Sequence, residues 1–413
     1  MPQQKPAILM ISQVYPPDPA AVGQYMHDAA AALVRRGCRV TVYCANRGYN
    51  DPAQKYSAQE VREGVEIRRL PLSSLGKKTM AHRLLAQSMF LLQAGLRGLF
   101  KRELNGILVS TSPPMASIAA LLIRFFRRVP VKFWVMDLNP DQLVAMGKVR
   151  PTSLVAHAFN ALNRTILRVA DDVIALDRFM ADRLTQKLDV RSKLTVLPPW
   201  PLDAMEPVDH GENPFRTEHG LEGKFVVMYS GNHGQTTPVT TLLEAAVRMQ
   251  DRSKLVFMFI GGGVGKRDVE AVLERYRPAN IISLPYQPFE RLRYSLSAAD
   301  VHVVTMDDAV VGVIHPCKVY GAMALARPVL FIGPDQSHVG DIMRGESIGW
   351  QIRHGDVDGT VAALDEMLRM DPGELEAMGR RAAQIVNERF QRALMMKTFS
   401  DVVLRTGPRP LVG

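Results

Sequence analysis

The sequence predicts an α/β protein built from two Rossmann-like, doubly wound domains that face each other across a cleft. Short apolar segments alternate with amphipathic helical segments along most of the 413 residues, a pattern typical of parallel sheets covered by helices. A cluster of prolines near residue 200 interrupts this alternation and separates two sets of strands and helices. In both sets an apolar segment runs directly into a glycine-bearing loop, as in folds that bind phosphate groups at the carboxyl ends of their strands.

The first set opens in the order of a βαβ unit. Ala7–Val14 is a mostly apolar run that predicts a buried strand, and the proline-rich residues 15–23 predict a loop that ends at Gly23. Apolar side chains at helical spacing predict a helix over Gln24–Arg36, and a strand is expected at Arg39–Cys44. The same patterns place the later elements at 107–110 (strand), 116–127 (helix), 131–136 (strand), 153–170 (helix), 173–175 (strand) and 194–197 (strand).

The second set begins with the apolar strand Phe225–Ser230, which runs into the glycine loop Gly231–Gly234. Its further elements are expected at 240–249 (helix), 254–260 (strand), 266–275 (helix), 281–284 (strand), 290–298 (helix), 301–305 (strand), 317–326 (helix), 329–332 (strand), 357–370 and 374–388 (helices), with a last helix ending near 403. The prolines at 198–201 and the polar residues up to His219 predict an interdomain linker. We therefore expect domains at 1–203 and 204–388, and a terminal helix and tail at 389–413 that packs back on the first domain.

Net charge is +10 and is unevenly distributed. Residues 1–203 carry 28 Lys and Arg against 15 Asp and Glu, whereas residues 204–413 carry 23 against 26. A basic excess confined to one half favours an anionic partner, such as a lipid surface or a phosphorylated acceptor, over a merely soluble basic surface. The chain contains no nucleic-acid-binding signature, so we expect no nucleic-acid partner.

Residues 80–100 have apolar side chains at helical spacing with cations interleaved or flanking, and a second basic, aromatic cluster lies at 124–128. The cations of the first segment are Lys77, Lys78, Arg83, Arg97, Lys101 and Arg102. Such a helix either lies on an anionic bilayer or covers the core of its own domain. No uncharged stretch approaches the roughly 20 residues of a membrane span, and no signal peptide precedes the first strand. We expect a cytoplasmic protein that associates peripherally with the membrane.

The three cysteines are odd in number and stand alone, so neither a disulfide framework nor a metal site is expected.

Residues 310–329 contain a lysine with a specific electrostatic problem. His315 and Pro316 open a predicted helix and place Lys318 in its first turn. A cation beside the free N–H groups of a helix N-terminus is unfavourable unless an anion binds there too. A diphosphate would fit this position, and a solvent-facing lysine is the alternative.

Two carboxylates follow the strand at 131–136. Asp137 and Asp141 stand four residues apart, and either could orient or deprotonate an acceptor hydroxyl. A cap on the following helix is the simpler interpretation for Asp141, whereas we favour a role in the site for Asp137.

Short segments spread over most of the chain carry a resemblance to a known family. They are Gln13–Pro17 with Gly23, Thr111–Pro114, Asp137–Asp141, Tyr229–Gly234, Ile260–Gly263, Pro285–Pro288, Ala298–Val301, Pro316–Gly321 and Ala326–Val329. In order and spacing they resemble the retaining glycosyltransferase family 4, of GT-B fold. The similarity is greatest to the branch that builds capsule, O-antigen and exopolysaccharide repeats.

The resemblance implies that the second domain binds a nucleotide-sugar, a UDP-linked hexose or N-acetylhexosamine, and that the first binds a lipid-linked glycan. It implies transfer with retention and without a metal or cofactor. Asp137 and Lys318 are the implied catalytic residues. The implied donor-binding residues are Gly23, Gly231, Asn232, His233, Gly234, Gly262, Gln287, Val313, Pro316, Tyr320 and Gly321.

Val313 and Gly321 stand where most family members have two glutamates, the second of which holds the ribose. This departure leaves open a non-catalytic partner subunit that anchors a true transferase. A sugar-nucleotide epimerase on the same architecture is a further alternative, but it would need several carboxylates in the cleft, and only Asp137 and Asp141 are candidates.

Overall fold

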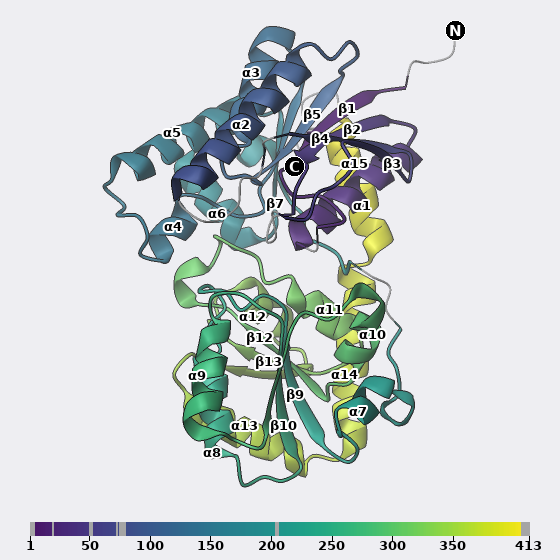
Figure 1. Cartoon of the computed structure of the whole chain (residues 1–413), viewed down its shortest axis with the longest axis vertical. Coiled ribbons are helices and arrows are strands. Elements are labelled where there is room, and N and C mark those ends of the chain that lie inside the picture. The colour runs from purple at the N-terminus through teal and green to yellow at the C-terminus, as the bar shows by residue number, and fades with distance from the viewer. Residues whose placement is uncertain are drawn as a thin grey trace. The chain divides into compact units, whose positions relative to one another are not determined.

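The computed structural model describes residues 5–18, 20–48, 53–71, 73, 80–202 and 206–405, without the side chains of residues 80, 81, 83 and 84. The chain divides into two compact units (Figure 1). Unit 1 comprises Met1–Pro199, Gly312–His315 and Arg392–Gly413, and unit 2 comprises Trp200–Val311 and Pro316–Gln391. Three predictions lie outside the described residues: the cations Lys77 and Lys78, the side chain of Arg83, and the domain boundary after residue 203.

Unit 1 contains an eight-stranded sheet in which every neighbouring pair is parallel except β3 and β4. In spatial order the strands are β3 (Gln59–Arg62), β4 (Val65–Leu70), β2 (Arg39–Ala45), β1 (Ala7–Ile11), β5 (Gly106–Ser110), β6 (Val131–Trp134), β7 (Asp172–Ala175) and β8 (Leu194–Val196). The order runs outward in both directions from β1 and β5, as in a doubly wound fold. The topological switch point, where such sheets bind ligands, therefore lies between β1 and β5.

The helices of unit 1 are α1 (Ala21–Arg35), α2 (Met80–Leu99), α3 (Ser117–Arg127), α4 (Asp141–Ala145), α5 (Leu154–Val169), α6 (Arg178–Lys187) and α15 (Arg392–Leu404), with a 3-10 turn at Arg191–Lys193. The terminal helix α15 packs beside α1, where Arg392 pairs with Asp28 at 2.7 Å. Its Phe399 is fully buried, with the ring centroid 4.3 Å from that of Trp134 on β6. This aromatic contact anchors the end of the chain to the sheet of unit 1.

Helix α2 covers the domain core with one face and leaves apolar side chains exposed on the other. Phe90 and Ala94 are fully buried, whereas Leu92 is 53% and Phe100, just after the helix, 82% exposed. Helix α3 lies side by side with α2 (Figure 1) and ends in the exposed Phe125 and Phe126. One face of α2 therefore covers the core of its domain, and the interpretation that the segment lies on an anionic bilayer stays a prediction for the exposed face. Among the described helices, none is long and apolar enough to cross a membrane.

Unit 2 contains a six-stranded sheet in which all neighbouring pairs are parallel. The strands in spatial order are β11 (Ile281–Leu284), β10 (Leu255–Ile260), β9 (Phe225–Ser230), β12 (Val301–Thr305), β13 (Val329–Ile332) and β14 (Gly349–Ile352). The helices are α7 (Pro214–Glu218), α8 (Thr240–Arg248), α9 (Lys266–Tyr276), α10 (Phe289–Ser297), α11 (Lys318–Ala324), α12 (His338–Met343), α13 (Val357–Arg369) and α14 (Pro372–Arg389), with 3-10 turns at His210–Glu212 and Asp308–Val310. The order again reverses next to the first strand, which places the switch point between β9 and β12. The predicted fold class is confirmed.

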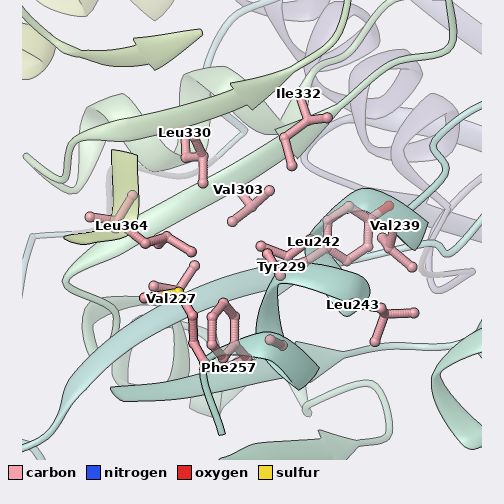
Figure 2. Packing of buried hydrophobic residues seen from close by; sticks show 14 of the residues in the cluster. Val227, Tyr229, Val239, Leu242, Leu243, Phe257, Val303, Leu330, Ile332 and Leu364 are labelled. Carbon is pink, nitrogen blue, oxygen red and sulfur yellow. The ribbon is translucent and has the colours of Figure 1, made fainter. Parts of the chain in front are cut away.

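Both faces of this sheet are buried, as expected for parallel strands. Val227 and Tyr229 of β9 point into one apolar cluster with Phe257 (Figure 2), and Val226 and Met228 point into the cluster on the opposite face. The alternation follows from the two-residue period of a strand.

The linker prediction is wrong for residues 206–219, because these residues pack on unit 2. Phe215 of α7 is fully buried in the apolar cluster beneath β9 and β10. The buried Arg216 donates to the carbonyls of Ala298, Leu221 and Lys224. Polar composition indicated a solvated segment, but the side chains of Asn213 and Arg216 form hydrogen bonds with backbone groups of unit 2.

The prediction missed three strands and four helices. Strands β3 and β4 form a hairpin through Glu63 and Gly64, and both strands, like β14, carry partly exposed or charged side chains. The missed helices α4, α6, α7 and α12 have ten or fewer residues, too short for a clear apolar period. The predicted loop at 15–23 is also too long, since α1 begins at Ala21.

Candidate functional site

Two glycine-bearing loops interlock at the carboxyl edge of the sheet in unit 2. The loop after β9 meets the loop after β10 through two backbone hydrogen bonds, His233 N–H to Gly262 O and Gly265 N–H to His233 O, each 2.8 Å long. Gly231, Gly261 and Gly263 have φ angles of 125°, 124° and 126°, which side chains other than glycine rarely tolerate. The two loops predicted from their glycines therefore pack directly against each other.

The close approach of these loops explains the glycine at position 261. A Cβ atom there would lie 2.0 Å from the carbonyl oxygen of Gly231, and one at Gly263 would lie 2.5 Å from the Asn232 side-chain oxygen. No rotation of a side chain relieves the first clash, because the obstacle is backbone.

Replacement of Gly261 by Ala should therefore destabilise unit 2, by at least the roughly 1–3 kcal/mol of a disfavoured backbone conformation. Gly321→Ala is the matched control, since a Cβ at this helical position meets nothing within 4 Å and alanine favours a helix over glycine by about 1 kcal/mol. Thermal unfolding should show a lower midpoint for Gly261→Ala and an unchanged or higher one for Gly321→Ala. Equal midpoints for Gly261→Ala and the wild type would show that the loops do not touch in this way.

Lys318 is the first residue of α11, which follows β12, and its side chain reaches across the switch point to the loop after β9. Its ammonium donates to the Tyr229 hydroxyl (2.5 Å) and to the Asn232 carbonyl (3.1 Å), and it lies 3.8 Å from the centroid of the Tyr229 ring. Burial lowers the pKa of Lys318 to about 7, with no carboxylate to oppose the shift. These contacts are two neutral oxygens and a π face, so among the described residues no carboxylate compensates the charge of this lysine.

A second lysine, Lys266, and a neutral histidine, His233, lie beside Lys318. The Lys266 ammonium donates to Phe259 O (2.6 Å) and Leu284 O (3.0 Å) at the ends of β10 and β11, and burial lowers its pKa to about 8. Burial, reinforced by Lys266 and Lys318, lowers the pKa of His233 to about 4, so its ring is neutral at pH 7. Its Nδ1 lies 3.1 Å from the Gly231 carbonyl and therefore donates, which leaves a buried Nε2 without a hydrogen-bond partner among the described residues.

The loop after β11 lies against the same glycines. The Tyr286 hydroxyl donates to Gly262 O at 3.1 Å, and its ring is 54% exposed. Gln287, predicted from the resemblance, donates to Pro285 O within its own loop at 3.1 Å. The aromatic face available at this edge thus comes from Tyr286, which the sequence argument did not single out.

Three predicted donor-site residues lie in or just before α11: Tyr320, Gly321 and Pro316. Tyr320 is fully buried, its hydroxyl 2.7 Å from His338 Nε2 and its ring centroid 5.0 Å from that of Phe390. These contacts make Tyr320 part of the packing of unit 2. Gly321 is surrounded by open space, and Pro316 lies just before the helix, where its carbonyl accepts from Val319 N–H at 3.3 Å.

Val313 belongs to unit 1, together with the rest of the segment Gly312–His315. Its carbonyl accepts a 2.8 Å hydrogen bond from Leu138 N–H, next to Asp137. His315 Nδ1 lies 2.8 Å from the carboxylate of Asp177, and both side chains are almost completely buried. Asp177 also caps α6. The sequence argument missed this pair, because the two residues are 138 positions apart.

Asp137 follows β6 at the carboxyl edge of the sheet in unit 1. Its backbone N–H donates to Thr111 Oγ1 at 3.0 Å, which fixes the turn. Burial raises the pKa of its carboxyl group to about 6, with no cation to oppose the shift. Asp137 is half-buried as a whole residue, so a ligand can approach it.

The cap predicted for Asp141 is wrong. Asp141 is the first residue of α4. Pro140 occupies the cap position, and no side-chain hydrogen bond caps the helix. The Asp141 carboxylate pairs instead with Lys187 of α6 at 2.8 Å. Of the two predicted carboxylates, Asp137 is the one that has no ion-pair partner among the described residues.

Gly23 lies in the first turn of α1, against the loop after β1. A Cβ there would lie 3.1 Å from Tyr15 Cα, so the helix approaches the backbone of this loop closely. In the described part of the chain, no group of three or more His, Cys, Asp or Glu side chains is placed to hold a metal ion.

Residues 20–200 match the glycosyl transferase 4-like domain. This part of the chain is therefore similar to the family of glycosyl transferase 4-like domains. Over 409 residues the chain is 22% identical to the "Probable glycosyltransferase WbjE" of Pseudomonas aeruginosa, with 98% of each chain covered. It is 23% identical to WcaI of Escherichia coli K12, provisionally named a colanic acid biosynthesis glycosyl transferase, with 81% of this chain and 85% of that chain covered.

Solved structures confirm the predicted GT-B fold. Sucrose-phosphate synthase from Thermosynechococcus elongatus superposes with a TM-score of 0.75 at 17% identity, over 96% of this chain and 98% of that one. Anabaena HepE, solved in complex with UDP and glucose, superposes with a TM-score of 0.72 at 12% identity, over 95% and 98%.

Proposed function

We propose that this protein is a family 4 glycosyltransferase that moves a sugar from a UDP-linked donor to a lipid-linked glycan during synthesis of a cell-surface polysaccharide. The observation that carries the proposal is the uncompensated charge of Lys318 over the glycine loops of unit 2. The name of WcaI supports a role in polysaccharide synthesis, and the UDP in the HepE structure supports UDP as the nucleotide of the donor.

The donor diphosphate would bind at the switch point of unit 2. Lys318 and Lys266 supply positive charge, and glycine loops allow a phosphate to approach the backbone. The exposed ring of Tyr286 supplies a surface on which a base can stack. When the bond between the anomeric carbon and the diphosphate oxygen breaks, the electron pair stays on the oxygen, and Lys318 stabilises the charge that develops there.

The acceptor would bind at the carboxyl edge of unit 1. Its hydroxyl oxygen forms the new bond to the anomeric carbon on the face that the diphosphate leaves, so the configuration is retained. The hydroxyl proton passes to the carboxylate of Asp137, which is ionised above its pKa of about 6. Asp137 belongs to unit 1 and Lys318 to unit 2.

We place the enzyme in the cytoplasm, associated peripherally with the membrane. The apolar side chains that α2 and α3 leave exposed, together with nearby arginines, support this placement. They include Leu85, Leu92, Leu96, Phe100, Phe125 and Phe126.

A non-catalytic partner subunit is the second candidate, favoured by Val313 and Gly321 at the positions of the family's glutamates. Calorimetric titration of the purified protein with UDP, GDP and their sugar conjugates separates the two. We expect UDP and UDP-sugars to bind and GDP to bind at least tenfold more weakly, followed by transfer of labelled sugar to an extracted lipid-linked glycan. Binding of no nucleotide by the folded protein would overturn the transferase and leave the partner subunit.

A further inference from the structure

The edge of the sheet in unit 1 has a polar face under the end of α2. Strand neighbours Thr41 and Tyr43 of β2 pair with Glu66 and Arg68 of β4, and all four line one groove of about 710 Å³. Strands of a parallel sheet are normally apolar on both faces. In β4 the opposite face begins with the fully buried Val65 and Ile67 and ends with Arg69, which is buried and pairs with Glu60. The face toward α2 is therefore built to meet a polar ligand or water.

Cations exceed carboxylates in this groove. The cations are Arg39, Arg68, Arg97, Lys101 and Arg102, and the carboxylates are Glu66 and Glu103. Both carboxylates are already paired, Glu103 with Arg39 and Glu66 with Arg68. Lys101 donates to Thr41 Oγ1 at 2.9 Å, which in turn donates to Glu66 at 2.7 Å. Among the described residues, the other three cations, Arg97, Lys101 and Arg102, form no ion pair with a carboxylate.

The negative end of the α2 helix dipole explains only some of the cations in the groove. A helix C-terminus attracts cations, which accounts for Arg97 in the last turn and Lys101 just beyond it. It does not account for Arg39 and Arg68, which come from strands. Partial burial lowers the pKa of Lys101, so the groove holds this charge at a cost that a bound anion would remove.

Exposed apolar side chains border the groove. Leu96 and Phe100 line it and are 44% and 82% exposed, and Leu92 continues the row along α2. Cations beside exposed apolar side chains match the two parts of a phospholipid, whose phosphate is anionic and whose acyl chains are apolar. A soluble phosphate would have no use for the apolar border.

We propose that this groove binds the phosphate headgroup of an anionic phospholipid and so fixes unit 1 to the membrane. Its lining begins at Ala7 and Arg39, the first residues of β1 and β2. It therefore lies toward the amino ends of the strands, whereas Asp137 follows the carboxyl end of β6. The headgroup site is thus separate from the acceptor edge. The inference rests on the membrane placement proposed above and is independent of the donor chemistry.

The test is sedimentation of the full chain with phosphatidylcholine vesicles, with and without phosphatidylglycerol. The double variant Arg97→Gln/Arg102→Gln removes two groove cations. Arg164→Gln/Arg168→Gln is the matched control, which removes two exposed arginines of α5 outside the groove. We expect the first pair to weaken binding to phosphatidylglycerol vesicles by about 5-fold per cation, and the control to bind like the wild type. Calorimetry with UDP on the same proteins shows whether the donor site is intact.

Three outcomes would overturn the proposal. Equal losses in the two double variants would mean diffuse attraction by surface charge, and equal binding of neutral and anionic vesicles would mean apolar insertion alone. Titration of inorganic phosphate that depends on Arg97 and Arg102, without vesicle binding, would identify a soluble anion as the ligand. If vesicle binding fails while UDP still binds, the headgroup site is wrong and the proposed transferase is unaffected.

Discussion

Replacement of Lys318 by Ala should lower kcat by about 100- to 1000-fold, the usual effect of removing one group that stabilises a developing oxyanion. The lysine is positioned for this role by two neutral oxygens, those of Tyr229 and Asn232, and no carboxylate offsets its charge. UDP should also bind more weakly, because the diphosphate loses a cation in both the ground state and the transition state. Transfer assays with saturating donor measure the first effect, and calorimetry measures the second.

The pH dependence of UDP binding gives an independent test of the same residue. With a pKa of about 7, Lys318 is largely neutral at pH 8 in the free protein, and a bound diphosphate should restore its proton. Binding at pH 8 should therefore take up a proton, and UDP affinity should fall as pH rises above 7. Lys266, with a pKa of about 8, titrates in the same range. Loss of the proton uptake in Lys318→Ala would therefore assign the uptake to Lys318.

The exposed Lys254→Ala is the control, since it removes a lysine of unit 2 far along the strand from the glycine loops. Both kcat and proton uptake should match the wild type in this variant. A Lys318→Ala enzyme with wild-type kcat would place the stabilising charge elsewhere.

The sequence predicted most of the sheet of unit 2 well, because most of its strands are short apolar runs. Strands β9, β11, β12 and β13 have the bounds expected from their apolar runs. Strand β14 was missed because all of its residues are partly exposed and its composition is mixed. Strand β4 was missed for a related reason, since Glu66 and Arg68 on its polar face interrupt the apolar pattern.

The candidate site was predictable only where a single residue conflicted with its local environment. Lys318 was identified because a cation is misplaced at a helix N-terminus, and glycines marked the two loops. The contact of these loops depends on the register of β9 with β10, and the Asp177–His315 pair depends on how the chain returns to unit 1. Tertiary arrangement creates both features, so no local pattern in the sequence reports them.

Asp137→Asn should abolish most of the transfer activity, by about 100- to 10,000-fold, because an amide cannot accept the acceptor's proton. In the wild type the activity should rise with pH through about 6, where the buried carboxyl group ionises, and then level off. The residual activity of the variant should lack this rise. Rates measured from pH 5 to pH 8 with saturating donor test both statements.

Asp137→Asn should raise the stability of the protein at pH 7.5 while it lowers the activity. This difference separates a catalytic role of Asp137 from a structural one. The folded-state pKa of Asp137 is raised above its unfolded value, so the folded state binds the proton more tightly and loses stability as pH rises through 4 to 6. An asparagine resembles the protonated form at every pH. Asp137→Asn should therefore unfold at a higher temperature than the wild type at pH 7.5 and at nearly the same temperature at pH 4. Since most residues that only support a fold destabilise it when replaced, an inactive variant with a raised midpoint would assign Asp137 to the reaction. An inactive variant with a lowered midpoint would assign it to the fold.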